Sequence, residues 1–190
     1  MVALKDNYPR FTPEEYFAWE EQQPVRHEYI NGEVYAMTGG TINHSQIASN
    51  FNRLLGNHLR GSGCKTLNSD ARVNILESSH YVYPDVSVTC DERDKTTTQY
   101  ITYPCLIVEV LSSSTESYDR GNKFKLYRRN PCLQEYVLVD AETMAIELYR
   151  KADGDTWRII DFEPGDEVEL TSISLTFPIE QVYEDIEFAI

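Results

Sequence analysis

The strongest constraint on the fold is an apolar run that contains one carboxylate. Residues 105–111 read CLIVEVL, and Glu109 is the only charged residue among them. Both alternating faces of the run are otherwise apolar, which predicts a strand buried on both sides and therefore central in a sheet. An ionised carboxylate in an apolar interior is costly unless it is paired or binds a metal ion. Glu109 is thus a candidate functional residue, with a core ion pair as the structural alternative.

A second carboxylate stands in a comparable position. Asp85 follows Tyr83-Pro84 and precedes Val86, near the start of a strand that we predict over residues 81–90. Neighbouring strands lie about 4.8 Å apart, so facing carboxylates on two strands can share one divalent ion. Mg²⁺ is typically held by one or two carboxylates together with water and a substrate phosphate. We therefore expect Asp85 and Glu109 to form a Mg²⁺ or Mn²⁺ site.

The rest of the pattern predicts α/β content around a mixed sheet. Thr12-Pro13-Glu14-Glu15 begins a helix that runs to about residue 21. Asn31-Gly32 indicates a hairpin over residues 27–37, and Asn43 is expected to cap a helix over 44–60. Further elements are expected as a strand at 64–76, a helix capped by residues 113–116 at 114–130, a strand at 135–140, a hairpin over 145–163, and a short strand and a helix (178–185) in the tail.

The composition fits an ordinary globular protein, with 41% hydrophobic and 25% charged residues. The four cysteines, at positions 64, 90, 105 and 132, lack the close spacing of a zinc site. We expect them to be reduced thiols of a cytoplasmic protein. The N-terminus is too polar for a signal peptide, and no apolar run approaches the roughly 20 residues that span a bilayer.

The charge balance restricts the partners. The chain has 17 basic and 31 acidic residues, a net charge of −14. This argues against a protein that coats nucleic acid, because phosphate contacts need clustered Lys and Arg. A local basic strip can nevertheless exist on an otherwise acidic protein.

Pro84-Asp85, followed by Glu109 in an apolar strand and within this order of elements, gives the chain a resemblance to the PD-(D/E)XK nuclease superfamily. The resemblance is closer still to the putative restriction endonuclease domain family within it. The resemblance covers nearly the whole chain. It implies one restriction-endonuclease-like domain over residues 1–190, with an αβββαβ core, an N-terminal helix and hairpin, and a C-terminal β-hairpin extension. The matching segments are 12–16, 26–35, 43–45, 83–86, 107–112, 115, 118–123, 127–128 and 134–140.

The chain departs from the superfamily motif at Leu111, where the motif has lysine. We expect Lys123, on the following helix, to take this role, because Arg120, Lys123 and Tyr127 share one helix face. The structural alternative is a solvated surface lysine. Lys125 lies on another face of the same helix and is the natural control.

The resemblance also implies an accessory acidic residue ahead of the core strands. Glu28, Glu33 and Asp70 are the candidates, with a plain hairpin residue (Glu33) and a partner of Arg26 (Glu28) as structural alternatives. His44, at a helix start, is a candidate for contacting phosphate or a metal-bound water. A histidine there is more often a surface or capping residue.

The expected function is Mg²⁺-dependent hydrolysis of phosphodiester bonds in DNA, with Asp85 and Glu109 as metal ligands and Lys123 stabilising the transition state. The resemblance adds a homodimer as the assembly that cuts a duplex. Two alternatives stay open. One is a catalytically degenerate nuclease-fold protein that acts in nucleic-acid binding, regulation or dimerisation. The other is a metal-dependent hydrolase of a different substrate.

Overall fold

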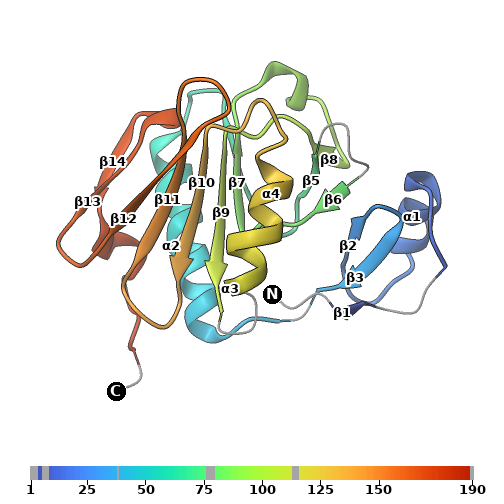
Figure 1. The fold of residues 1–190 in the computed structure, drawn as a ribbon, viewed down its shortest axis with the longest axis horizontal. Helices are drawn as coiled ribbons and strands as arrows, with labels where there is room; N and C mark the ends of the chain where they lie inside the picture. The colour runs from blue at the N-terminus through green and yellow to red at the C-terminus, as the bar shows by residue number, and fades with distance from the viewer. Residues whose placement is uncertain (1–3, 6–8, 38, 76–79, 113–115, 189–190) are drawn as a thin grey trace.

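The computed structural model describes residues 4–5, 9–37, 39–75, 80–112 and 116–188. A six-stranded mixed sheet forms its centre, and Figure 1 shows helices on both sides of it. The strand order is β12-β11-β10-β9-β7-β4. β9 and β10 are parallel, and the other neighbours are antiparallel. The strands are β4 (Lys65–Asn68), β7 (Val86–Thr89), β9 (Leu106–Leu111), β10 (Glu135–Asp140), β11 (Ile146–Lys151) and β12 (Trp157–Phe162).

Two helical layers cover this sheet. On one face lies α2 (Ile42–His58), whose Ile47 and Phe51 pack into a core cluster with Val108 and Val110 of β9. On the other face lies the helical segment 116–127, whose Tyr127 packs in a second cluster with Ile107 and Leu111. β9 is therefore buried on both sides, as its sequence predicts. The predicted core order is present as α2, β4, β7, β9, segment 116–127 and β10.

A second six-stranded mixed sheet, in the order β1-β3-β2-β6-β5-β8, lies beside the first. Helix α1 (Pro13–Glu20) packs on it through Tyr16, which stacks on Tyr29 at 5.0 Å between ring centroids. The capping box at Thr12 is confirmed, as is the hairpin at Asn31-Gly32, where both residues have positive φ. The strands are β1 (Leu4–Lys5), β2 (His27–Ile30), β3 (Glu33–Ala36), β5 (Arg72–Ile75), β6 (His80–Val82) and β8 (Tyr100–Ile101).

Two of the predicted strands are corrected. Segment 64–76 forms β4 and β5, and segment 81–90 forms β6 and β7, with one strand of each pair in each sheet. A turn at residues 68–71 divides the first segment, closed by the amide of Ala71 donating to the carbonyl of Asn68. In the second segment Pro84, which has no N–H for a sheet ladder, stands between the strands. Asp85 therefore lies where the chain crosses from one sheet to the other.

The helices also differ from the prediction in detail. Thr41, rather than Asn43, caps α2, because its hydroxyl accepts from the amide of His44. Segment 116–127 is not a uniform α-helix: α3 (Glu116–Tyr118) and α4 (Phe124–Tyr127) flank a π-helical turn, η2 (Asp119–Lys123). The predicted capping residues 113–115 lie outside the described residues. Short 3-10 helices are η1 (Glu92–Asp94) and η3 (Thr171–Ile173).

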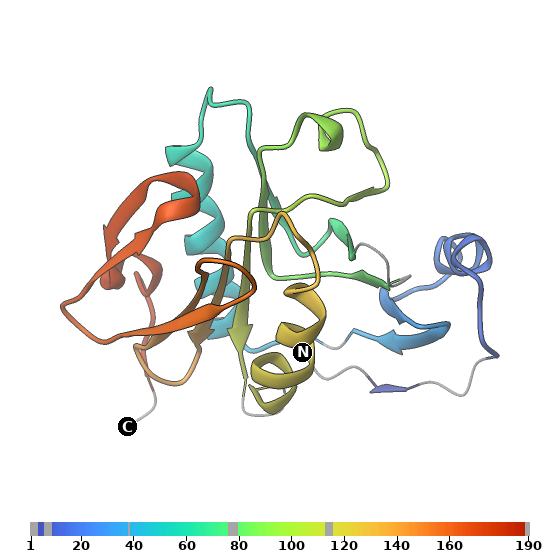
Figure 2. The ribbon, with the colours of Figure 1, turned by 45° about the horizontal axis from the view of Figure 1, so that its top comes forward.

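The C-terminal part adds to the main sheet and to the α2 layer. The predicted hairpin over 145–163 is confirmed as β11 and β12. The tail contains a second hairpin, β13 (Glu167–Leu170) and β14 (Leu175–Pro178), and then the 3-10 helix η4 (Ile179–Val182) in place of the predicted α-helix. Figure 2 shows this hairpin beside α2, where the rings of Phe51 and Phe177 meet edge to face.

The expectation of four reduced cysteines is wrong for two of them. Cys64 and Cys90 form a disulfide, with their Cα atoms 4.1 Å apart. They flank β4 and β7, whose register pairs Lys65 with Thr89, so the next residues outward face each other. Cys105 and Cys132 are free thiols. Over the described ranges, no helix combines the length and apolar character needed to cross a membrane.

Candidate metal and nuclease site

The crossing point between the two sheets brings Asp85 level with Glu109. The register of β7 and β9 pairs Val86 with Val108, and continuing it by one residue sets the two carboxylates opposite each other. Asp85 Oδ2 accepts a hydrogen bond of 2.8 Å from the amide of Val110, the residue after Glu109. Both side chains are buried. Asp85, just before β7, therefore stands level with Glu109 of β9.

Lys123 and Tyr127 approach Glu109 from the helical segment. Lys123 Nζ lies 3.0 Å from Glu109 Oε1, and the Tyr127 hydroxyl donates to the same oxygen at 2.8 Å. Lys123 is only 3% exposed, which is unusual for a lysine, whereas Lys125 on the same helix is exposed. Lys123 thus places its ammonium group beside the Glu109 carboxylate, on the face of the sheet that the helical segment 116–127 covers.

Two further carboxylates surround Lys123. Its Nζ lies 3.5 Å from Asp119 Oδ1 and 3.7 Å from Glu28 Oε1. Glu28 is the one residue of the three acidic accessory candidates that reaches this cluster. Asp119 is a residue that the sequence reasoning passed over. Its spacing of four from Lys123 was the available signal, because residues four apart lie on one side of a helix.

Burial and charge shift the pKa values of the cluster in different directions. Burial raises the pKa of Glu109 to about 8, with Lys123 opposing the rise and Asp85 adding to it. For Asp85, burial is outweighed by the adjacent imidazole of His44 and by the hydrogen bond from the Val110 amide, and its pKa falls below the usual range. Burial disfavours the charge of Lys123, but Glu109 and Glu28 outweigh it and raise the pKa of Lys123. Lys123 therefore stays protonated.

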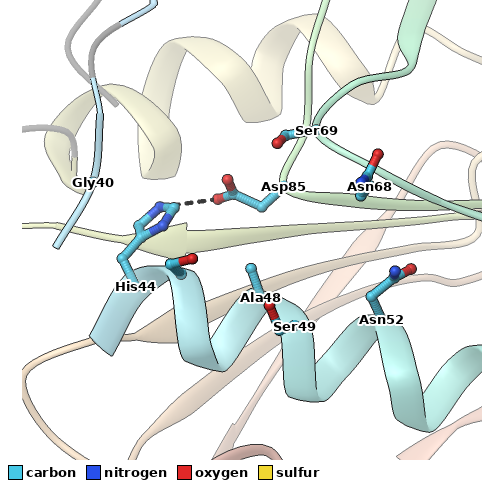
Figure 3. Close-up of a pocket in the computed structure, with 9 residues that line it drawn as sticks. Gly40, His44, Ala48, Ser49, Asn52, Asn68, Ser69 and Asp85 are labelled. Atoms are coloured by element: carbon cyan, nitrogen blue, oxygen red, sulfur yellow. Dashed lines mark ion pairs between the residues drawn. The ribbon is translucent and has the colours of Figure 1, made fainter. Parts of the chain in front are cut away.

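His44 completes the site from the α2 side. Its Nε2 lies 3.3 Å from Asp85 Oδ2, the contact drawn in Figure 3. Gly40 packs directly against this ring: a Cβ built at Gly40 would lie 2.8 Å from Cγ of His44. The glycine is therefore required for the present position of the imidazole.

Three other candidates lie elsewhere. Arg120 forms ion pairs with Glu116 and Glu147. Glu33 accepts from the Tyr35 hydroxyl at 2.8 Å and lies 3.6 Å from Arg10. Asp70 is paired with Arg26 at 2.7 Å, on the surface.

A polar pocket opens beside Asp85. Its volume is about 320 Å³, and α2 lines one side while the turn after β4 lines the other. Figure 3 shows Asn68 and Ser69 of that turn facing Ser49 and Asn52 of the helix. The carboxylate at the sheet crossing is thus accessible from a hollow of mainly small, polar side chains.

The donor set fits a sparse divalent-metal site. In the described part of the chain, no three His, Cys, Asp or Glu residues are grouped as a protein-only metal cage. Mg²⁺ does not require one, since it usually keeps several waters and takes one or two carboxylates. Glu109 uses Oε1 for Lys123 and Tyr127, and Asp85 uses Oδ2 for Val110 and His44. Neither second oxygen has a hydrogen bond to a described residue, which leaves one oxygen on each for a cation.

Comparison with known proteins assigns the fold and the family. The fold is shared with a crystal structure described as "a putative nuclease belonging to DUF820" from Anabaena variabilis ATCC 29413. The match has a TM-score of 0.73 and 19% identity, and covers 91% of this chain and 97% of that chain. The family described as "Uma2: Putative restriction endonuclease" matches residues 13–180, and the chain belongs to this family.

Two relatives come from Synechocystis sp. (strain ATCC 27184 / PCC 6803 / Kazusa). The protein named "Uncharacterized protein slr1290" is 50% identical over 181 residues, 95% of each chain. "Uncharacterized protein sll1609" is 37% identical over 152 residues, which cover 79% of this chain and 86% of that protein. The family resemblance drawn from the sequence is confirmed.

Proposed function

We propose that the protein is a divalent-metal-dependent endonuclease that hydrolyses phosphodiester bonds in DNA. One observation carries the proposal: Asp85, just before β7, stands opposite Glu109 of β9 when the register of the two strands is continued by one residue, and Lys123 Nζ lies 3.0 Å from Glu109 Oε1. Two carboxylates and one lysine are the residue types that such hydrolysis requires. They lie together here although Leu111, two residues after Glu109, occupies the position where the superfamily motif has lysine.

Asp85, Glu109 and Lys123 would have separate roles in this reaction. Asp85 and Glu109 would hold Mg²⁺ or Mn²⁺ through their second oxygens. The cation supplies Lewis acidity, which polarises the phosphate and makes water a better nucleophile at neutral pH. The protonated Lys123 would stabilise negative charge that develops on the phosphate oxygens.

The neighbouring groups would fix the orientation of the carboxylates. Tyr127 donates to Glu109, and the amide of Val110 donates to Asp85, so each carboxylate is oriented before substrate binds. His44 and Asp85 both line the polar pocket, where the imidazole would contact a phosphate that enters. Preorganised donors of this kind need no rearrangement during the reaction.

The test is cleavage of plasmid and single-stranded DNA in millimolar Mg²⁺. Wild type should cut, and Asp85→Asn and Glu109→Gln should not. Asp161→Asn is the matched control, because this exposed aspartate lies on β12, at the far edge of the sheet. If all four proteins behave alike, the assignment of the site is wrong.

Calorimetric titration with Mg²⁺ separates the alternatives. Metal binding that requires Asp85 and Glu109, without cleavage of DNA, would favour a hydrolase of another substrate. Absence of both binding and cleavage would favour a degenerate nuclease fold, in which Lys123 and the carboxylates form only a buried ion-pair cluster.

A further inference from the structure

A second, larger pocket adjoins the candidate site. Its volume is about 500 Å³, and its lining includes Arg26, Arg72 and Tyr83. Ser69 lines both this pocket and the one beside Asp85. Tyr83 precedes Asp85 by two residues, and two residues span no more than about 7 Å of chain. The two pockets therefore adjoin at Ser69, and the arginine-lined pocket lies next to the one that Asp85 lines.

Arg72 is a positioned cation without a carboxylate partner. Its Nε donates to the hydroxyl of Tyr83, and its guanidinium lies 5.3 Å from the ring centre of Phe17 and 5.8 Å from that of Tyr16. Within the described ranges, no carboxylate lies within ion-pair distance of it. Glu20, which lines the same pocket, binds the backbone amide and the ring of His27 instead. The terminal nitrogens of Arg72 are thus available to a ligand.

Arg26 has a partner that is easily displaced. It is paired with Asp70, and both side chains are largely exposed, at 46% and 68%. Exposed ion pairs of this kind contribute only about 0–1 kcal/mol. An incoming anion can therefore replace Asp70 at little cost, and Arg26 would then face the same hollow as Arg72.

We infer that this pocket is a phosphate-binding subsite, in which Arg26 and Arg72 hold the DNA backbone next to the phosphate that is cut. The inference rests on the proposed nuclease function. Guanidinium groups bind phosphate through paired N–H donors. Two of them beside the carboxylates would give a chain of net charge −14 the local positive strip that its overall composition lacks.

The test is the affinity of a fluorescein-labelled DNA duplex, measured by anisotropy over a range of salt concentrations in millimolar Ca²⁺. Arg26→Gln and Arg72→Lys should each weaken binding severalfold. Arg26→Gln should also reduce the slope of log affinity against log salt by about 1. Arg158→Gln is the control, because this exposed arginine lies on β12. Thermal unfolding of each variant checks that it is folded.

Asp70→Asn gives a result of opposite sign. It removes the group that competes with phosphate for Arg26, so it should tighten binding, whereas damage to the structure would weaken it. Unchanged affinity in the Arg26 and Asp70 variants, or a wild type that does not bind the duplex, overturns the subsite. Cleavage is scored separately. If wild type cuts DNA and the arginine variants bind it normally, the nuclease function stands and the phosphate subsite is wrong. If binding depends on the arginines but DNA is not cut, the subsite stands and the nuclease function is wrong.

Discussion

Lys123 is the residue on which the charge balance of the site depends. It is buried among Glu109, Asp119 and Glu28, and of the basic residues described it alone forms an ion pair with any of these three. The ammonium group favours the ionised form of Glu109 and so opposes the rise in pKa that burial causes. Removal of one partner from a buried charge network is far more costly than removal of a surface charge.

Lys123→Met therefore tests the buried cation, since methionine keeps the length of the side chain and removes the charge. We expect a loss of about 3 kcal/mol in the free energy of unfolding. The deficit should be larger at pH 8 than at pH 5. Without the ammonium group the folded-state pKa of Glu109 rises further above about 8, so the variant loses more stability than wild type as pH rises toward and past 8.

Urea denaturation at the two pH values measures this effect, with exposed Lys125→Met as the matched control, expected within about 0.5 kcal/mol of wild type. Equal stability of the two variants at pH 8 would show that Lys123 does not neutralise the cluster.

Sequence patterns identified part of this cluster for physical reasons. Glu109 was visible because charge is rare in an apolar strand, and Lys123 because helical spacing sets it beside Tyr127. The contact of His44 with Asp85 depends on how α2 packs on the sheet, which no local pattern encodes. Arg120 was grouped with Lys123 by α-helical spacing, but the intervening turn is π-helical and Arg120 pairs with Glu147.

At the scale of elements, periodicity identified strands but not their sheets. Segments 64–76 and 81–90 were each predicted as one strand, although the alternation in the first covers only part of it. The turn at 68–71 and Pro84 divide each segment between the two sheets. β9 was predictable because a strand buried on both faces has a distinctive composition. The crossing that places Asp85 depends on long-range pairing, so the sequence indicated the residue and not its surroundings.

The loop before α2 determines the position of His44. Gly40→Ala would place a methyl group 2.8 Å from Cγ of the ring, which must then move. A displacement of about 1 Å of a group that positions substrate can cost up to a hundredfold in rate. We expect DNA cleavage to fall at least severalfold with little change in thermal stability.

Gly39→Ala is the neighbouring control, since nothing lies within 4 Å of a Cβ built there. If the two alanine variants cut DNA at the same rate, the position of His44 is not important for the reaction.

The disulfide between Cys64 and Cys90 joins the start of β4 to the end of β7. It closes a loop between two residues that are 26 positions apart in the sequence. Restricting the unfolded chain over a loop of this length contributes roughly 3 kcal/mol. Cys64→Ser should therefore lower the free energy of unfolding by about that amount under oxidising conditions. Cys132→Ser, which removes a free thiol, should have a much smaller effect.

Urea unfolding with and without dithiothreitol measures the contribution of the disulfide. Reduction should bring wild type to the stability of Cys64→Ser and leave that variant unchanged. A wild type that is insensitive to dithiothreitol would exclude a stabilising disulfide.

At the scale of the whole molecule, the net charge of −14 and the carboxylates around Lys123 both make the stability of the folded chain depend on added cations. Self-repulsion among like charges destabilises a compact chain, and any added salt screens it. A specific cation site would add a second effect, because a ligand that binds only the folded state stabilises it by an amount that rises with the logarithm of its concentration above Kd. The two effects can be separated by comparing cations at equal ionic strength.

We therefore expect millimolar Mg²⁺ or Mn²⁺ to raise the melting temperature more than NaCl of the same ionic strength. At a hundredfold excess over Kd the stabilisation is about 2.7 kcal/mol, which corresponds to several degrees for a chain of this length. Asp85→Asn and Glu109→Gln should respond to both salts alike, because the specific component is removed and screening remains. Asp161→Asn should keep the wild-type difference. A wild type whose melting temperature rises equally in MgCl₂ and NaCl would leave only screening, and the two carboxylates would then have no role as metal ligands.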